Sequence, residues 1–439
     1  MTNPNIIIVL TDQQRHDTCG CYGQKLEITP NLDQMADEGV IFTNAFTCQP
    51  LCGPARASIQ TGLYSTETGV FRNNIKLRPF NKTFAEYLSL EGYSLGYIGK
   101  WHLSGIKSGK VPRKYRGGYK EFWLASNALE FTSGPYQGHM FDKDNNKVEF
   151  EDQYRVDFLT DCALNYIETQ SKNDKQPFLL FLSYLEPHHQ NTKVSMGHFQ
   201  GPKGSKEKFK DYKVPKDLEG LEGNWEEELP DYLGCCYNID KNLKRIHDKL
   251  ENLNLSDNTI IIFTSDHGCH FKTRNLEYKR SCHEGSIHIP LVIKGPGFKG
   301  GKEITELVSL IDLAPTILKM ANLEKPSHMK GETLQKLMAG EIEDWRKEVF
   351  IQISESQVGR AIRTKKWKYS VKAPHKIGFL HKRSKIYQEE YLYDLENDPF
   401  EKKNLVGDPE YKNIRSKLAE ILKQKMREAG EKVPKIKPI

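Results

Sequence analysis

Four short runs of apolar residues along the chain are hydrophobic at both odd and even positions. Runs of this kind are typical of strands that are buried on both faces, as in a mainly parallel sheet. The four runs are Ile6–Leu10, Phe178–Ser183, Thr259–Thr264 and Ile289–Ile293. Segments with helical spacing lie between or after them: Asn31–Glu38, Lys82–Glu91, Val156–Thr169, Tyr232–Leu253 and Ile311–Ala321. This alternation predicts an α/β fold in which helices sandwich a mainly parallel sheet.

The pattern changes after Trp345, where shorter β-like pieces follow one another without long helices between them. These pieces are Val349–Ile353, Arg360–Thr364, Lys368–Val371 and Tyr391–Asp394, and a charged helix over Tyr411–Glu428 closes the chain. We therefore predict a large α/β domain over residues 1–340 and a smaller α+β domain over 341–439, made of a small antiparallel sheet and the terminal helix.

The bulk composition excludes several classes of protein. The chain has 439 residues and a formal net charge of +6, with no basic block typical of a nucleic-acid-binding arm. No apolar run is long enough to span a bilayer, and no secretory signal precedes Ile6. We expect a cytoplasmic protein if Met1 is the natural start, and a secreted or periplasmic one if a signal peptide has been removed. The nine cysteines form no disulfide pattern, and the oligomeric state stays open.

Polar side chains follow the predicted strands at the point where each strand ends. Asp12 and Gln13 follow the first run, Asp266 and His267 follow the third, and His188 comes shortly after the second. A further short run over residues 97–99 leads into Lys100 and His102. Ligands bind at the carboxyl ends of strands in open parallel sheets, so we expect these side chains to share one site.

The donors in this group favour a hard divalent cation. Asp12, Asp266 and the amide oxygen of Gln13 offer oxygen ligands, which suit Ca²⁺, and less well Mg²⁺, better than zinc. The histidines lack the spacing of a helical zinc site. The sequence therefore predicts one metal ion, most favourably Ca²⁺, at this edge of the sheet.

A second feature is the segment Leu51-Cys52-Gly53-Pro54-Ala55-Arg56, followed by Thr61-Gly62. Taken alone, it predicts a buried thiol at the start of a helix, with proline in the first turn. The Cys-x-Pro-x-Arg pattern followed by Thr-Gly resembles the signature of formylglycine-dependent (type I) sulfatases, in the alkaline-phosphatase-like superfamily.

The resemblance extends along nearly the whole chain in order. Its further blocks are Asn5–Asp12, Gly20–Gly23, Thr29–Gly39, Gly99–Leu103, Pro187-His188, Ser265–Gly268, Lys279–Gly285, Tyr391–Leu395, Asp398-Pro399 and Asn404-Leu405. It implies an alkaline-phosphatase-like fold and a sulfuric ester hydrolase.

The resemblance also implies a mechanism. A maturation enzyme converts Cys52 to formylglycine, whose hydrate attacks sulfur with help from the metal. His188 protonates the leaving oxygen, and His102 then accepts a proton so that sulfate is expelled. Lys100 and Lys279 hold the sulfate oxygens and Arg56 orients the formylglycine. The implied metal ligands are Asp12, Gln13, Cys52, Asp266 and His267; the implied substrate contacts are Lys100, His188, His267 and Lys279.

Three residues depart from the family pattern. Gln13 stands where many sulfatases have Asp, which lowers the negative charge of the metal site. His267 replaces the common Asn, and imidazole is a poor Ca²⁺ ligand. Three roles for His267 therefore stay open: it coordinates the metal, it contacts the sulfate, or it lies behind the residues that coordinate the metal. Ala55 replaces the common Ser, which bears on the choice of maturation enzyme.

Two other functions stay open: a phosphonate or phosphate monoester hydrolase of the same superfamily, and a non-catalytic relative that binds sulfated glycans. We expect the substrate to be a sulfated small molecule or saccharide. We further hypothesise that a basic run in the C-terminal domain reads acidic groups of that saccharide, with Trp367 or Phe379 available to pack on a sugar ring. This run comprises Arg360, Arg363, Lys365, Lys366, Lys368, Lys372, Lys376, Lys382, Arg383 and Lys385.

Overall fold

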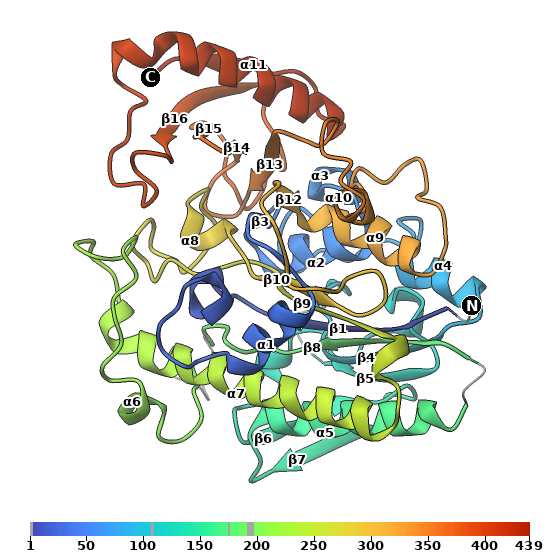
Figure 1. The fold of residues 1–439 in the computed structure, drawn as a ribbon. Helices are drawn as coiled ribbons and strands as arrows, with labels where there is room; N and C mark the ends of the chain where they lie inside the picture. The colour runs from blue at the N-terminus through green and yellow to red at the C-terminus, as the bar shows by residue number, and fades with distance from the viewer. Residues whose placement is uncertain (1–2, 107–108, 174–175, 191–196) are drawn as a thin grey trace.

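The computed structural model describes residues 3–106, 109–173, 176–190 and 197–439. Its larger part is built on a ten-stranded sheet with the order β11-β2-β10-β9-β1-β8-β4-β5-β6-β7 (Figure 1). The strands are β1 (Asn5–Thr11), β2 (Val40–Phe42), β4 (Ser94–Lys100), β5 (Phe122–Ser126), β6 (Gln137–Phe141), β7 (Lys147–Glu151), β8 (Phe178–Ser183), β9 (Thr259–Ser265), β10 (Leu291–Lys294) and β11 (Lys302–Ile304). A separate two-stranded sheet pairs β3 (Ala45–Phe46) with β12 (Val308–Ser309).

The middle of the large sheet is parallel from β9 through β1, β8 and β4 to β5. The register aligns the ends of these strands: Thr11 pairs with Ser265, and Lys100 pairs with Ser126. Their carboxyl ends therefore meet along one edge, which confirms the predicted mainly parallel sheet and gathers the residues that follow the strands.

One predicted strand has a different relation to its neighbours. The run Ile289–Ile293 forms β10, but this strand is antiparallel to both β9 and β2. The connection from β9 to β10 contains only the four-residue helix α8 (Glu284–Ile287) and stays at the carboxyl edge. Without a helix long enough to cross back over the sheet, the chain must return in the opposite direction.

Helices cover both faces of the large sheet (Figure 1). On one face α2, α4 and α9 pack with Ile6, Ile8 and Leu10, and on the other α1, α5 and α7 pack with Ile7 and Val9. The helices of this domain are α1 (Pro30–Glu38), α2 (Cys52–Thr61), α3 (Ser65–Thr68), α4 (Phe84–Leu90), α5 (Arg155–Ser171), α6 (Ser205–Lys208), α7 (Trp225–Asn252), α9 (Leu313–Met320) and α10 (Gln335–Met338).

Helix α7 begins earlier than the predicted segment Tyr232–Leu253. It starts at Trp225 and includes Pro230. Three glutamates in its first turn favour a helix N-terminus there, because negative charge stabilises that end of the helix dipole.

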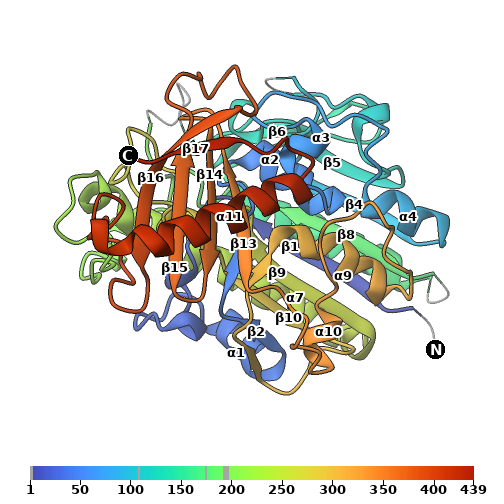
Figure 2. The same ribbon diagram turned by 90° about the horizontal axis from the view of Figure 1, so that it is seen from above.

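The C-terminal part is a five-stranded sheet with the order β13-β14-β15-β16-β17. Its elements are β13 (Glu348–Ile353), β14 (Gly359–Thr364), β15 (Trp367–Lys372), β16 (Ile386–Asp394), α11 (Lys412–Glu428) and β17 (Lys435–Lys437). Figure 2 shows α11 lying across the strands of this sheet. The smaller domain is confirmed, and β17 adds one parallel pairing to its antiparallel sheet. The boundary near residue 340 stays a prediction.

One face of the small sheet packs against the large domain. Val349, Ile351 and Ile353 of β13 contact a cluster that includes Cys282 and Ile287. The opposite face carries α11. The segment around residues 279–287 is therefore held between the two sheets.

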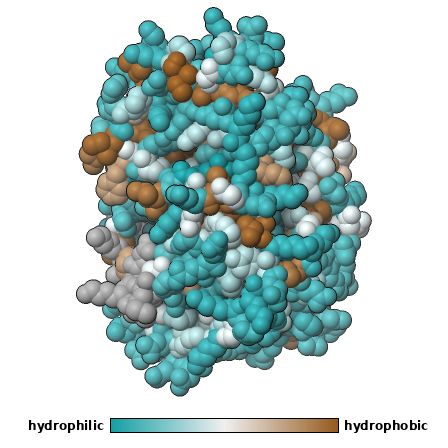
Figure 3. All heavy atoms as spheres, turned by 90° about the vertical axis from the view of Figure 1, so that its left-hand side faces the viewer, coloured by the Kyte–Doolittle hydropathy of each residue, from teal (hydrophilic) through white to brown (hydrophobic). Residues whose placement is uncertain are grey.

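The surface that faces left in Figure 1 is mostly hydrophilic, and its apolar side chains lie in separate patches (Figure 3). Among the described residues, no helix combines the length and the apolar character that a membrane span requires.

Candidate active site

Cys52 lies at the centre of the candidate site, as the first residue of α2, and its side chain is buried. Its Sγ atom is 2.9 Å from Lys279 Nζ, 3.3 Å from His267 Nε2 and 3.4 Å from Asp12 Oδ1. Gly53 follows directly, and its N–H donates to Asn73 Oδ1 at 3.0 Å. The start of α2 therefore places position 52 among groups from several strand ends.

Arg56 holds the two buried carboxylates side by side. Its Nε donates to Asp266 Oδ2 and its Nη2 to Asp12 Oδ2, both at 3.0 Å. Its Nη1 donates to the carbonyl of Lys100 and to Ser183 Oγ at the end of β8. One turn of helix separates Arg56 from Cys52. Helix α2 therefore fixes the position of the thiol and, through Arg56, that of the two carboxylates.

Two lysines supply positive charge on either side of this cluster. Lys100 Nζ is fully buried and lies 2.8 Å from Asp12 Oδ2. Lys279 Nζ lies 2.8 Å from His188 Nε2 as well as next to Cys52. Both ammonium groups therefore lie near position 52, where an anionic group would need them.

These charges shift the ionisation of the groups around them. Although burial opposes ionisation, Lys100 and Lys279 hold the pKa of the Cys52 thiol well below its usual value. Burial, then Lys279 and Lys100, lower the pKa of His188 to about 4. Burial and the charge of Asp12 raise the pKa of Asp266 above its usual value. Asp266 is hard to ionise because Asp12 beside it is already negative, and a cation bound between the two carboxylates would remove this repulsion.

Four donor atoms lie close enough together to hold a metal ion: those of Asp12, Cys52, Asp266 and His267, all buried. His267 Nδ1 is 2.9 Å from the carbonyl of Gly268. Because a carbonyl only accepts, Nδ1 carries the proton, and in the neutral ring the lone pair of Nε2 points toward the cluster. The donors present therefore fit a cation, with Cys52 Sγ standing where an oxygen of the modified residue would be.

The remaining two predicted residues are placed differently. The backbone N–H of Gln13 donates to Asp266 Oδ1 at 3.2 Å, but its amide oxygen accepts from the N–H of His189 at 3.3 Å. That oxygen is thus engaged by the backbone of His189. His102 is buried, lies near enough to Cys52 to contribute to the lowered pKa of its thiol, and lines the cavity that opens above it.

Comparisons with known proteins agree with this arrangement. The family model described as "Sulfatase" matches residues 4–323, and that of the N-sulphoglucosamine sulphohydrolase C-terminal region matches residues 275–428. The chain belongs to the sulfatase family. It is accordingly a sulfuric ester hydrolase by family, with the alkaline-phosphatase-like fold.

Individual relatives are similar to this sulfatase over almost its whole length. An ulvan-active sulfatase of Formosa agariphila is 31% identical over 98% of this chain and 82% of its own. An N-acetylglucosamine-6-O-sulfatase of Bacteroides thetaiotaomicron is 27% identical over 98% of this chain and 88% of its own. A solved structure in complex with its substrate D-glucosamine-2-N,6-O-disulfate shares the fold, with a TM-score of 0.79, 24% identity and 98% coverage of both chains.

The structure adds site residues of this sulfatase that the sequence motifs do not mark. A cavity of about 230 Å³ opens above Cys52. Besides residues already described, its lining contains Asn73, Asn74, Glu130, Phe131, Glu277, Tyr278 and Arg280. Only Arg280 carried a signal, since it follows Lys279 in the block Lys279–Gly285 that resembles the family. The others come from loops and short turns whose path the local sequence does not specify.

The basic run of the C-terminal domain has a different role from the one hypothesised. Six of its ten cations pair with carboxylates: Arg360 with Glu431, Arg363 with Glu284, Lys365 with Glu306, Lys366 with Glu396, Lys368 with Glu284 and Glu401, and Lys372 with Glu390. None of the ten is among the residues that line the catalytic cavity, and neither are Trp367 and Phe379. The acidic partners are distant in sequence, so folding neutralises most, though not all, of the apparent excess of charge.

Proposed function

We propose that this sulfatase hydrolyses a sulfate ester of a sulfated carbohydrate, with a nucleophile made from Cys52 and a bound Ca²⁺. The observation that carries the proposal is the placement of Cys52 Sγ within 3.4 Å of Lys279, His267 and Asp12. The carbohydrate class rests on the relatives, which are named for ulvan and N-acetylglucosamine 6-sulfate. The cation, when bound, would supply positive charge that activates the oxygen of residue 52.

Asp12, Asp266, His267 and the modified residue 52 would hold the cation, with Gln13 as a further ligand if its amide turns. Arg56 fixes the two carboxylates, since one guanidinium donates to both. Ca²⁺ fits the carboxylates best, while the imidazole leaves room for Mg²⁺ to compete. Metal content and activity after chelation and re-addition of each ion would distinguish the two.

The two lysines would bind the sulfate. Lys100 Nζ approaches position 52 from the end of β4 and Lys279 Nζ from the connection between β9 and α8, and both would donate to sulfate oxygens as negative charge builds on them. Water has little access there, because both side chains are buried, and burial strengthens such contacts.

His188 and His102 would move the protons. With a pKa of about 4, His188 is neutral in the free enzyme at neutral pH. Its Nε2 lies 2.8 Å from Lys279 Nζ, so both groups would face the same bound sulfate. The negative charge of that sulfate would favour the protonated imidazole, which would give its proton to the leaving alcohol oxygen. His102, which lines the same cavity as residue 52, would accept a proton from that residue when sulfate is released.

The maturation enzyme would act before the chain folds. Cys52 is buried and lies within the first turn of α2, so the folded protein gives a modifying enzyme no access to it. Co-expression with a formylglycine-generating enzyme should therefore raise activity, whereas treatment of the purified folded protein should not.

The direct test is release of sulfate from a panel of sulfated saccharides and an aryl sulfate, with the aryl phosphate as comparison. Faster turnover of the sulfate supports the proposal. Faster turnover of the phosphate would make the protein a phosphate monoester hydrolase, and binding of sulfated glycans without turnover by matured protein would make it a binding relative.

A further inference from the structure

The catalytic cavity has a wall that the proposed chemistry does not use. Cys52, His188 and Lys279 line it at the catalytic end, and Glu130 and Phe131 line it as well. Both belong to a short 3-10 turn, Leu129–Phe131, that follows β5 at the carboxyl edge of the sheet. At about 230 Å³ the cavity is smaller than sites for drug-sized ligands, which suits a single sugar ring.

Glu130 has a carboxylate that faces this cavity with unused acceptor capacity. Its side chain is only 11% exposed, and its Oε2 atom has no hydrogen-bond partner among the described residues. Lys100 Nζ is 3.5 Å away from it but 2.8 Å from Asp12, which is therefore the closer partner of that lysine. Oε2 is turned to the buried Lys100, while the carboxylate as a whole lines the cavity, so a hydroxyl of a bound ligand can donate to it from that side.

Phe131 is exposed beside it. Its ring is 58% accessible to solvent even though it lines a cavity. The turn that carries it is fixed from behind, because Leu129 is fully buried and Thr132 Oγ1 donates to Ser126 Oγ at 2.9 Å. An aromatic face held in this way next to a hydrogen-bond acceptor is suited to the apolar face of a sugar ring.

The charges on the rim disfavour a second anionic group. Arg280 is the cation of the rim, and its guanidinium is already engaged by two carboxylates. Its Nη2 is 2.7 Å from Glu355 Oε2 and its Nη1 donates to Glu277 Oε2 at 2.6 Å. Beyond the sulfate-binding end, a further sulfate or carboxylate on the sugar would face Glu130 and Glu277 without a free guanidinium to receive it.

We propose that Glu130 and Phe131 form a subsite for the sugar ring that carries the sulfate, and that this subsite selects sugars with no other charge. Glu130 accepts a hydrogen bond from a ring hydroxyl, and Phe131 packs on the ring. The inference rests on the proposed function, since it takes the sulfate to be bound at position 52. It assigns specificity to the large domain rather than to the basic run of the C-terminal domain.

The test measures binding at equilibrium in a Cys52→Ala background, where no turnover interferes. Calorimetric titrations would use the 6-sulfates of N-acetylglucosamine, glucose and galactose, together with glucosamine 2-N,6-O-disulfate. The protein should bind at least one monosulfate more tightly than the disulfate. Glu130→Gln should weaken that monosulfate about threefold to tenfold, because a neutral acceptor replaces a charged one. Glu130→Gln should also reduce the difference in affinity between that monosulfate and the disulfate, because the carboxylate that repels the second sulfate is gone.

Phe131→Ala provides a second, independent variant and should weaken the same monosulfate about tenfold through loss of ring packing. The matched controls are Phe80→Ala, another exposed phenylalanine that lies outside the cavity, and Glu151→Gln on β7, and both should leave binding unchanged. Thermal unfolding of each variant would verify that it folds.

Three results would overturn the subsite: no binding of any monosulfate, tighter binding of the disulfate, or Glu130→Gln and Phe131→Ala variants that bind like the controls. The proposed function is tested separately by the matured parent. If that protein releases sulfate from an aryl sulfate, then failure of these titrations removes only the subsite. If it hydrolyses no sulfate ester, the proposed function itself fails.

Discussion

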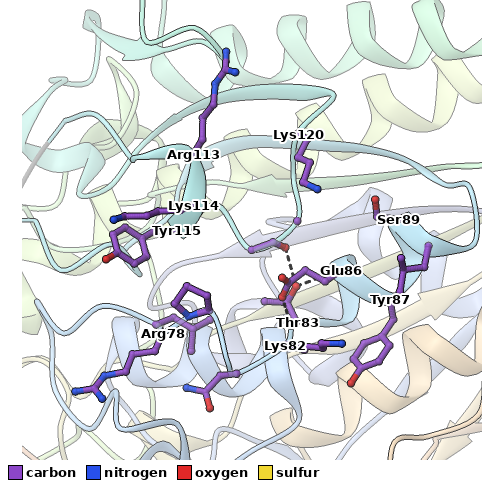
Figure 4. A pocket seen from close by; sticks show the side chains of 16 residues that line it. Arg78, Lys82, Thr83, Glu86, Tyr87, Ser89, Arg113, Lys114, Tyr115 and Lys120 are labelled. Carbon is purple, nitrogen blue, oxygen red and sulfur yellow. Dashed lines mark hydrogen bonds between the residues drawn. The ribbon is translucent and has the colours of Figure 1, made fainter.

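Two hollows in the large domain show what separates a reaction site from an ordinary surface depression. The hollow shown in Figure 4 is the larger, at about 350 Å³ against about 230 Å³ for the cavity above Cys52. Five cations line it: Arg78, Lys82, Arg113, Lys114 and Lys120. They are all exposed, and in Figure 4 Arg78, Arg113 and Lys114 extend away from Glu86 at the centre of the view.

The catalytic cavity has the opposite character. Asp12, Lys100, Asp266 and His267 are fully buried and point at one another. Opposite charges brought together without water interact strongly, whereas exposed cations are screened by solvent and salt. Glu86 illustrates the difference, since its carboxylate only caps α4 by accepting from the N–H of Thr83. Convergence of buried charge, rather than volume or net charge, therefore marks the site.

The largest expected effect follows from removing a buried carboxylate of the cluster. Asp12→Asn should lower kcat/KM for an aryl sulfate by about 10³-fold, because a metal ligand is lost and Lys100 and Arg56 lose their shared partner. Added Ca²⁺ should raise the Tm of the parent and leave that of the variant unchanged. If the parent keeps its full rate after exhaustive chelation and Asp12→Asn is as active as the parent, the metal has no part in the reaction.

Replacement of Lys279 should have the next largest effect. Lys279→Met should lower kcat/KM by about 10²-fold, since one sulfate-binding charge is lost. After burial, Lys279 is the largest cause that keeps the pKa of His188 at about 4, so its removal should raise that pKa toward the ordinary value of histidine. His188 would then be protonated up to a higher pH than in the parent. NMR titration of the imidazole would show the shift, and an unchanged pKa would contradict the assigned contact.

A third prediction concerns stability more than rate. Lys368 is fully buried between Glu284 and Glu401 and ties β15 to the segment that follows Lys279. Lys368→Met should destabilise the fold by about 3–5 kcal/mol, because two buried carboxylates lose their cation. Urea unfolding measures this loss. Lys372→Met on the same strand, half exposed and paired with Glu390, is the matched control and should cost less than about 1 kcal/mol.

The smallest effect is expected in the hollow of Figure 4. The double variant Lys82→Ala/Lys120→Ala should change kcat/KM for both sugar sulfates and an aryl sulfate by less than about twofold at physiological salt, because exposed charges at a distance are screened. A loss of tenfold or more confined to saccharides would show that the larger hollow binds substrate, and the contrast between the two hollows would fail.

The sequence predicted what depends on local pattern. The runs that became β1, β8 and β9 were recognisable because both of their faces are apolar. Because such strands are parallel, the residues that follow them could be placed at one edge of the sheet. The direction of β10 was not predictable in this way, since it depends on a connection without a crossover helix.

Residues whose role depends on distant partners were also missed. Glu130 and Arg280 come from segments without periodicity, and the cavity that unites them exists only in the folded chain. The basic run was misread for the same reason: Lys368 and Arg363 find their carboxylates in Glu284, far away in sequence.

The most direct test of the central claim combines two readings on one set of preparations. Protein made with increasing amounts of a formylglycine-generating enzyme would be digested, and mass spectrometry of the peptide containing residue 52 would give the fraction that has lost sulfur and gained an aldehyde. Sulfate release from an aryl sulfate would be measured on the same samples. The account predicts that the rate rises in proportion to the aldehyde fraction and vanishes with it. Full activity in a preparation whose Cys52 is entirely unmodified would contradict it.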